Sequence, residues 1–280
     1  MTRIIDGKSI AEDIYKELKE EVDRLSDKPG LAVVLVGDDP ASLVYVRNKE
    51  RACKRLNLNY RLAKFPPSIS REELKSSIEK LNADKSINGI IVQLPVPEHL
   101  DSFGIISSVD PLKDVDGLHP DNMGRLVSGR PRLIPCTPLG IVELIKREGI
   151  DVRGKRAVIV GRSNLVGKPL IHLLLSLDAT VTVCHSKTAD LKRETSEGDI
   201  LVVAVGKPRF ITKDMVKEGA VVIDVGINRV ENKLVGDVDF EEVASITSLI
   251  TPVPGGVGPM TVAMLMKNLI TAYNIQSNKQ

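Results

Sequence analysis

Two hydrophobic periods alternate along this chain. Short runs of consecutive apolar residues, typical of covered strands, are separated by stretches in which apolar residues recur every three or four positions, as in amphipathic helices. Strands are predicted at residues 31–36, 61–65, 89–94, 157–160, 180–184, 200–205, 220–225 and 249–251, with a loop or hairpin at 226–239. Helices are predicted at 8–25, 42–56, 138–148 and 260–273, after the capping box of Ser70 and Glu73, and after the turn at 161–167. This alternation predicts an α/β fold of parallel sheets with helical covers.

The periodicity weakens between residues 95 and 138, which is typical of a functional segment or a domain boundary. Thr137 and Pro138 then fit the N-cap and first position of a helix that bridges two domains. With 280 residues the chain is long enough for two cores. We expect one domain from residues 1–138 joined by a C-terminal helix at 262–280, and a Rossmann-type domain from residues 139–261.

Composition and charge narrow the class of protein. The net charge is +2, tryptophan is absent and no basic stripe interleaves with aromatic residues, so neither nucleic acid nor a membrane surface is an expected partner. The N-terminal residues lack the apolar core of a signal peptide, and no apolar stretch reaches the length of a membrane span. The three cysteines, Cys53, Cys136 and Cys184, lie far apart, which disfavours a disulfide framework and predicts a cytoplasmic protein.

The turn after the strand at 157–160 is the candidate for nucleotide binding. The dinucleotide template requires glycine at 161, 163 and 166. The sequence carries Gly161, Ser163, Val166 and Gly167. An NAD site also expects an acidic residue at the tip of the next strand, and none is present there. Arg162 and Ser186 suit a 2′-phosphate instead, which favours NADP, although an ordinary turn without a ligand remains the alternative.

Three polar residues are candidates for catalysis. Tyr45 and Lys49 lie one turn apart on one face of a predicted helix, which Cys53 continues as a partly apolar face. Desolvation there would lower the pKa of the lysine and make a neutral amine available, and the alternative is an ammonium that reaches water. Gln93 ends a buried strand, where open α/β sheets place ligand contacts, unless its side chain is simply solvated.

Two loops offer further binding groups. Residues 114–117 resemble the start of an EF-hand loop, but the remaining ligands are missing, so no metal is expected. Asp116 can instead accept hydrogen bonds from an amino-pyrimidine edge. The loop at 252–259 combines glycines and prolines, which suits backbone contact with a flat ligand or an ordinary turn before the last helix. The histidines and serines show no metal-ligand or triad pattern.

These features occur together in an order that resembles the bifunctional methylenetetrahydrofolate dehydrogenase/cyclohydrolase family. The matching motifs are Ile5-Asp6-Gly7-Lys8, Tyr45-Val46-x-x-Lys49, GIIVQLP at 89–95, KDVDG at 113–117, Pro135-Cys136-Thr137-Pro138, VGRSNLVG at 160–167, CHSKT at 184–188, Gly226-Ile227-Asn228 and TPVPGGVGPMT at 251–261. They span nearly the whole chain, and their joint occurrence is far more specific than any single motif.

The resemblance implies a role for each candidate residue. Tyr45 would stack on the folate ring system, Lys49 would be the essential catalytic group, and Gln93 would hydrogen-bond the lysine and help to keep its amine neutral. Asp116 would hold the amino-pyrimidine edge of the pterin. The folate site would also be lined by Pro254, Gly255, Gly256 and Val257. The family's NADP contacts fall on Gly161, Arg162, Ser163, Ser186 and Ile227.

The activity implied by the resemblance uses both domains. The first domain would bind the folate and the Rossmann-type domain would bind NADP, with the substrate in the cleft between them. Oxidation of 5,10-methylenetetrahydrofolate with NADP⁺ would give the methenyl compound, and its hydrolysis would give 10-formyltetrahydrofolate. These steps belong to the one-carbon metabolism that serves purine biosynthesis. The resemblance also implies a homodimer.

Two other functions stay open at this point. A monofunctional NAD(P)-dependent methylenetetrahydrofolate dehydrogenase would lack the lysine-assisted hydration, and Lys49 and Gln93 argue against it. A non-catalytic nucleotide-binding regulator would keep only the Rossmann half, so that Tyr45 and Asp116 would be superfluous.

Overall fold

The computed structural model describes residues 2–231 and 233–277. Its internal contacts divide the chain into two compact units. The six-stranded unit consists of the residues up to Asp13 together with Thr137–Thr261, and the three-stranded unit consists of Ile14–Cys136 together with the described residues from Val262 onward. The boundaries fall within the helices α1 (Gly7–Asp23), α6 (Cys136–Arg147) and α10 (Val257–Ser277).

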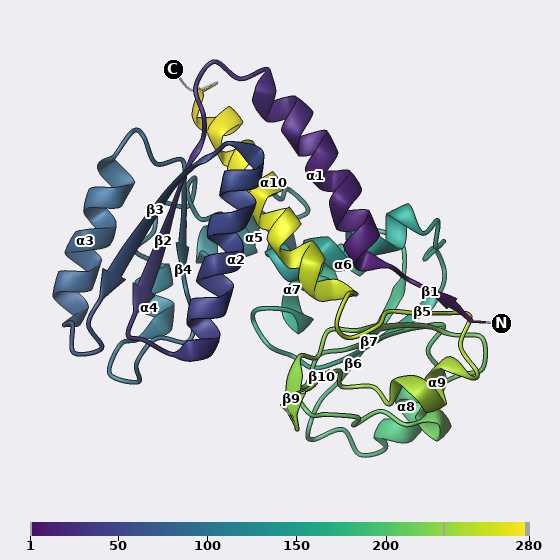
Figure 1. Ribbon diagram of the computed structural model, residues 1–280. Coiled ribbons are helices and arrows are strands. Elements are labelled where there is room, and N and C mark those ends of the chain that lie inside the picture. Colours follow the sequence, from purple (N-terminus) through teal and green to yellow (C-terminus); the bar gives the residue numbers. More distant parts are fainter. Residues whose placement is uncertain (1, 232, 278–280) are drawn as a thin grey trace. The chain divides into compact units, whose positions relative to one another are not determined.

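The three-stranded unit is built on a parallel sheet in the order β3-β2-β4. The central strand β2 (Gly30–Val36) is buried throughout, and it pairs with β3 (Asn59–Phe65) on one side and with β4 (Gly89–Val92) on the other. The helices α2 (Pro40–Leu56) and α3 (Arg71–Ala83) connect these strands, as parallel pairing requires. Figure 1 shows α3 and α2 on opposite sides of the three strands.

One face of this sheet packs against α3. That helix begins at the predicted capping box, in which the Ser70 hydroxyl accepts from the Glu73 N–H and the Glu73 carboxylate accepts from the Ser70 N–H. The buried cluster below it comprises Ala32, Val34, Val36, Ile69, Leu74, Ile78, Leu81, Ile87, Ile90, Val92, Leu100, Ile105 and Val109. The alternating positions of β2 in this cluster confirm the predicted strand and its buried face.

The segment with weak periodicity contains two short helices, α4 (Ser102–Ile106) and α5 (Pro120–Val127). A helix of one or two turns includes too few apolar positions to produce a recognisable period, which is why the sequence pattern did not predict them. Loops connect these helices to β4 and α6, and the loop between them carries the KDVDG motif.

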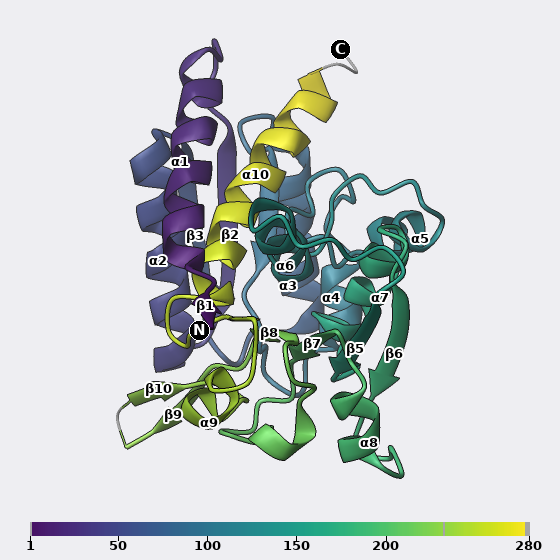
Figure 2. The same cartoon turned by 90° about the vertical axis from the view of Figure 1, so that its right-hand side faces the viewer.

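The six-stranded unit contains a parallel sheet in the order β1-β11-β8-β7-β5-β6. Its strands are β1 (Arg3–Ile4), β5 (Arg156–Val160), β6 (Thr180–Cys184), β7 (Ile200–Val203), β8 (Val221–Asp224) and β11 (Leu249–Ile250). Figure 2 shows β8, β7, β5 and β6 side by side. The chain runs from β5 to β6 on one side and then to β7 on the other. The carboxyl ends of β5 and β7 therefore form the switch point at which such sheets bind ligands.

The remaining elements of this unit are short. They are α7 (Gly167–Leu175), α8 (Leu191–Ser196), a 3₁₀ turn at Lys213–Met215, α9 (Phe240–Ala244), and an antiparallel hairpin of β9 (Asn228–Val230) and β10 (Lys233–Val235). The hairpin lies where a loop or hairpin was predicted. In the described part of the chain, no helix has the length and apolarity that crossing a membrane would require.

Three details differ from the sequence prediction. Helix α6 begins at Cys136, so Thr137 lies inside the helix and is not its N-cap, and the Thr137 hydroxyl shares a 3.0 Å hydrogen bond with Thr261 instead. Helix α10 begins at Val257, three residues before the predicted start, and extends to Ser277. The residues up to Asp13 group with the six-stranded unit, whereas the expected division placed them with residues 14–138.

Candidate active site

A lysine on α2 and a glutamine after β4 form a direct hydrogen bond in the three-stranded unit. The Lys49 Nζ lies 2.5 Å from the Gln93 Oε1. Helix α2 starts with Asp39 as its N-cap and Pro40 in its first turn, which fixes the helical position of the lysine. The Gln93 N–H donates to the Val34 carbonyl at 2.8 Å, so sheet pairing fixes the glutamine backbone.

The Gln93 side chain has a defined orientation. Its Nε2 donates to the Leu94 carbonyl at 2.6 Å, which leaves Oε1 free to accept from Lys49. Tyr45 precedes the lysine by one helical turn, and 43% of its surface is exposed. Tyr45 therefore places an exposed aromatic ring one helical turn from the amine that Gln93 holds. That ring is accessible to a planar ligand.

Burial lowers the pKa of the Lys49 amine, and the negative charge of Asp116 opposes part of that shift. The desolvation expected from the apolar helix face is therefore present. Burial also raises the pKa of Asp116 to about 6, although the positive charge of the lysine favours the ionised carboxylate. Burial thus disfavours the charged form of both groups, whereas each charge favours the ionised form of the other, so the neutral amine is more accessible than on an exposed lysine.

The loop that carries Asp116 is anchored by the residues around it. Lys113 is buried, and its Nζ donates to three carbonyl groups at the C-terminal end of α3, at 2.7, 2.8 and 3.4 Å. Gly117 has a φ of +72°, and a Cβ there would lie 2.4 Å from the carbonyl carbon of Ile134. Only glycine fits this position, because both the backbone conformation and the space exclude a side chain.

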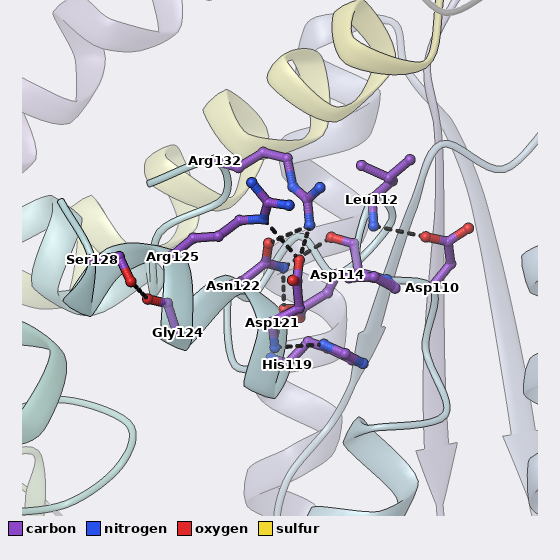
Figure 3. A network of polar contacts seen from close by, with 11 residues as sticks. Asp110, Leu112, Asp114, His119, Asp121, Asn122, Gly124, Arg125, Ser128 and Arg132 are labelled. Carbon is purple, nitrogen blue, oxygen red and sulfur yellow. Dashed lines mark hydrogen bonds and ion pairs between the residues drawn. The ribbon is translucent and has the colours of Figure 1, made fainter. Parts of the chain in front are cut away.

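Asp114 connects this loop to α5. Its carboxylate accepts from the His119 N–H at 2.7 Å and from the Asn122 Nδ2 at 2.9 Å. Figure 3 shows these groups converging, with Arg132 donating to the Asn122 side chain at 3.1 Å and pairing with Asp121. The backbone two residues before Asp116 is therefore held by a continuous polar network.

Two buried groups beside Asp116 were not recognised from the sequence. The Cys136 Sγ donates to the Val115 carbonyl at 3.2 Å, and the thiol lies close enough to the Asp116 carboxylate to favour its ionised form. The Asn268 Nδ2 donates to the carbonyls of Val115 and Ile134 at 2.9 and 2.8 Å. An amide within the apolar run of the last helix was the available signal for Asn268, whereas no local pattern pairs Cys136 with Asp116.

The predicted nucleotide turn has the backbone geometry of a phosphate-binding turn. Gly161 has a φ of +127°, and a Cβ there would lie 2.3 Å from the carbonyl oxygen of Ala204, which follows β7. Gly167 begins α7, and a Cβ there would lie 2.2 Å from the Gly161 carbonyl oxygen. Both close approaches require glycine. The positive end of the α7 dipole lies at this turn, which suits a pyrophosphate.

The other predicted cofactor contacts lie on exposed parts of the same unit. Arg162 and Ser163 are exposed within the turn. Ser186 is exposed after β6, in a tight turn closed by a 2.8 Å hydrogen bond from the His185 N–H to the Thr188 hydroxyl. Ile227 precedes β9 and is 48% exposed. None of these side chains is buried in the fold, so all four are accessible to a ligand.

The loop at 252–257 is held by backbone contacts in the six-stranded unit. Gly255 has a φ of +108°, and its carbonyl accepts from the Lys8 N–H at 2.9 Å. A Cβ on Gly7 would lie 2.0 Å from the Gly256 carbonyl oxygen. The Ile5-Asp6-Gly7-Lys8 motif therefore packs against the glycines of this loop. Pro254 is exposed, whereas Val257 starts α10 and is buried.

The predicted site residues thus divide between the two units. Lys49, Gln93 and Asp116 interact within the three-stranded unit, and Tyr45 lies one turn from the lysine. The six-stranded unit carries the remaining predicted residues, which are Gly161, Arg162, Ser163, Ser186, Ile227, Pro254, Gly255, Gly256 and Val257.

Family models match both parts of the chain. The model described as tetrahydrofolate dehydrogenase/cyclohydrolase, catalytic domain, matches residues 5–116. The model described as tetrahydrofolate dehydrogenase/cyclohydrolase, NAD(P)-binding domain, matches residues 135–277.

Individual relatives are similar over nearly their full length. The bifunctional protein FolD of Halothermothrix orenii is 57% identical over 277 residues, which cover 97% of this chain and 98% of that protein. The crystal structure of the bifunctional enzyme FolD from Campylobacter jejuni superposes with a TM-score of 0.96 at 48% identity, covering 98% of this chain and 100% of that one. The Trypanosoma brucei methylenetetrahydrofolate dehydrogenase-cyclohydrolase, complexed with NADP and an inhibitor, gives 0.94 at 38% identity, covering 99% and 98%. This chain belongs to the tetrahydrofolate dehydrogenase/cyclohydrolase family.

Proposed function

We propose that this chain oxidises 5,10-methylenetetrahydrofolate to the methenyl compound with NADP⁺ and hydrolyses that product to 10-formyltetrahydrofolate. The observation that carries the proposal is the hydrogen-bonded pair of Lys49 and Gln93, with the pKa of the lysine lowered by burial. The relatives named bifunctional FolD support both activities. A monofunctional dehydrogenase would lack the hydration step in which a neutral amine accepts a proton.

The six-stranded unit fits NADP. The glycine turn after β5 and the N-terminus of α7 are suited to the pyrophosphate, and the exposed Arg162 and Ser186 are suited to the 2′-phosphate. The similar Trypanosoma brucei enzyme was solved with NADP. Bound NADP⁺ supplies the acceptor for the hydride that leaves the one-carbon unit. We assign cofactor contacts to Gly161, Arg162, Ser163, Ser186 and Ile227.

In the dehydrogenase step the protein orients the folate. Tyr45 stacks on its ring system, and Asp116 accepts hydrogen bonds from its amino-pyrimidine edge. The methylene carbon loses a hydride with its two electrons, and the methenyl cation remains. A neutral Lys49 does not repel this cation, whereas a permanent ammonium would. The loop of Pro254, Gly255, Gly256 and Val257 completes the folate contacts by presenting backbone without long side chains.

In the cyclohydrolase step water adds to the methenyl carbon. A C–O bond forms and the attacking water loses a proton, which the neutral Lys49 amine accepts. The bond from that carbon to N5 then breaks, N5 receives a proton and 10-formyltetrahydrofolate is released, so the complete step adds one water and releases one proton. Gln93 positions the amine through Oε1. The nearby Asp116 carboxylate stabilises the lysine after it has taken up the proton.

Several further assignments extend this proposal. The three-stranded unit would bind the folate and the six-stranded unit NADP. We also place the protein in the cytoplasm, as a homodimer that supplies one-carbon units for purine biosynthesis, on the strength of the family resemblance. Size-exclusion chromatography with light scattering tests the dimer.

Absorbance measurements test the two activities separately. Wild-type protein mixed with methylenetetrahydrofolate should form reduced cofactor faster with NADP⁺ than with NAD⁺. Supplied methenyltetrahydrofolate should disappear faster than in buffer alone. A chain that forms no reduced cofactor is not a dehydrogenase, and methenyl compound that persists at its uncatalysed rate excludes the cyclohydrolase.

A further inference from the structure

Two buried aspartates that the reaction does not use lie in the six-stranded unit. Asp237 has no exposed surface, and its carboxylate accepts from three successive backbone N–H groups, those of Val205, Gly206 and Lys207, at 2.6, 2.9 and 2.8 Å. It also accepts from the Asn228 Nδ2 at 2.8 Å. Successive N–H groups of this kind form a nest that binds an anion, and here the anion is supplied by the chain itself.

The second aspartate holds the first. Asp224 ends β8 and is 3% exposed, and its carboxylate accepts from the N–H groups of Asp237 and Val238, each at 2.9 Å. It also accepts from the Gly226 N–H at 2.9 Å. Its own N–H donates to the Thr251 hydroxyl at 2.8 Å. The two aspartates therefore connect the ends of β7, β8 and β11, the last through the Asp224 backbone.

Two glycines make this arrangement possible. A Cβ on Gly226 would lie 2.3 Å from the Cγ of Asp237, and a Cβ on Gly236 would lie 1.8 Å from the Oδ2 of Asp224. Asp237 thus packs against Gly226, which follows Asp224 closely in the chain, and Asp224 packs against Gly236, which precedes Asp237. A side chain at either glycine would displace a buried carboxylate, so the close packing depends on all four residues.

The segments held in this way carry the predicted cofactor contacts. Ile227 lies between Gly226, whose N–H is bound by Asp224, and Asn228, whose amide is bound by Asp237. The loop held by Asp237 follows Ala204, whose carbonyl contacts the glycine turn after β5. Buried carboxylates therefore hold the Gly226 backbone on one side of Ile227 and the Asn228 side chain on the other before any ligand binds.

We propose that Asp224 and Asp237 are positioning residues for NADP, which preform the backbone around Ile227 and beside the Gly161 turn. The inference rests on the proposed function and extends it from residues that touch the cofactor to residues that act through them. A preformed site binds more tightly because less backbone must be ordered on binding.

The test is Asp237→Asn in the full-length chain. An amide offers one acceptor oxygen and turns an N–H₂ toward donors that require an acceptor, so part of the nest is lost. Calorimetric titration with NADP⁺ should give a Kd raised about tenfold, and the dehydrogenase KM for NADP⁺ should rise by a similar factor, while kcat falls less. Hydrolysis of supplied methenyltetrahydrofolate should stay within about twofold of wild type, because it needs no hydride acceptor.

Asp214→Asn is the matched control, since it removes a carboxylate of the same unit that is 60% exposed and pairs with Lys192. It should change none of these values. If Asp237→Asn does not fold, as judged by its thermal unfolding, Asn228→Ala removes one donor of the nest and should still weaken NADP binding selectively. An unchanged NADP affinity in the folded variant, or an equal loss of both activities, overturns the positioning role. A wild-type chain that forms no reduced cofactor overturns the proposed function instead.

Discussion

Lys49 and Gln93 are joined by a 2.5 Å hydrogen bond between the amine and the amide oxygen, and the glutamine is oriented by its own bond to the Leu94 carbonyl. The pKa of the lysine is lowered by burial and not by this bond, because the amide oxygen can accept from either protonation state. The glutamine therefore sets the position of the amine, and burial favours its neutral form.

Replacing Lys49 by glutamine should abolish the cyclohydrolase. General acid–base catalysis contributes about 10²–10⁴ in rate, so hydration of the methenyl substrate should fall by roughly that factor. The decay of methenyl absorbance measures it. Lys54→Gln is the matched control on the same helix, because that side chain is 73% exposed and pairs with Glu50. Near-normal hydration in Lys49→Gln would remove the lysine from this role.

Asp116→Asn should stabilise the protein relative to wild type more at alkaline pH than at acidic pH. The pKa of this carboxyl is raised to about 6 in the fold, above its value of 3.8 in the unfolded chain. The stability that its protonated form provides is present below about pH 4 and is lost as the pH rises through 6. An amide suffers no such loss.

Urea unfolding at pH 4.5 and 8 measures this effect. From pH 4.5 to pH 8, the free energy of unfolding of the variant should rise by on the order of 1–3 kcal/mol relative to that of wild type. Asp151→Asn is the control and should change little between these two pH values, because hydrogen bonds from Arg153 lower the pKa of that exposed carboxyl, which therefore titrates below both of them. A variant that follows wild type at both pH values would show that Asp116 is not desolvated.

Ser186→Asp should shift the cofactor preference from NADP toward NAD. Ser186 is exposed after β6, and a carboxylate there would repel a 2′-phosphate and accept hydrogen bonds from the ribose hydroxyls. The ratio of kcat/KM for NADP⁺ to that for NAD⁺ should fall roughly tenfold. Arg162→Ala should lower the NADP⁺ value alone. An unchanged ratio in both variants would place the 2′-phosphate elsewhere.

Two glycines near α5 give a paired test of backbone conformation. A Cβ at either position would meet no neighbouring atom within 4 Å, but Gly129 has a φ of +71° whereas Gly124 lies inside the helix. Gly124→Ala should therefore raise the free energy of unfolding by about 0.5–1 kcal/mol. Gly129→Ala should lower it by roughly 1–2 kcal/mol. Equal effects in denaturant unfolding would contradict this assignment.

Much of the fold follows from local patterns. Continuous apolar runs identified the buried strands, and the capping box placed the start of α3, because both signals lie within a few residues. Strand β1 could not be found in this way, since two residues carry no period and pair with residues 249–250. The start of α6 was misplaced because Thr137 bonds a residue distant in sequence, and an N-cap preference is too weak to exclude that.

In the candidate site, too, the sequence predicted what depends on neighbouring residues and missed the contacts between residues distant in the chain. The spacing of Tyr45 and Lys49 was enough to place them on one helix face, and the position of Gln93 followed from the end of its strand. The contacts of Asp116 with Cys136 and the carboxylate pair of Asp224 and Asp237 depend on residues brought together by the fold. No periodicity in the sequence reports such contacts.

The pairing of β1 with β11 also constrains how this protein is made. Arg3 aligns with Leu249, so this strand pairs with one that is synthesised much later. The edge of the six-stranded sheet therefore cannot close while the nascent chain is still being extended through its middle. Residues 3–4 reach their places in the sheet only after residues 249–250 have been made.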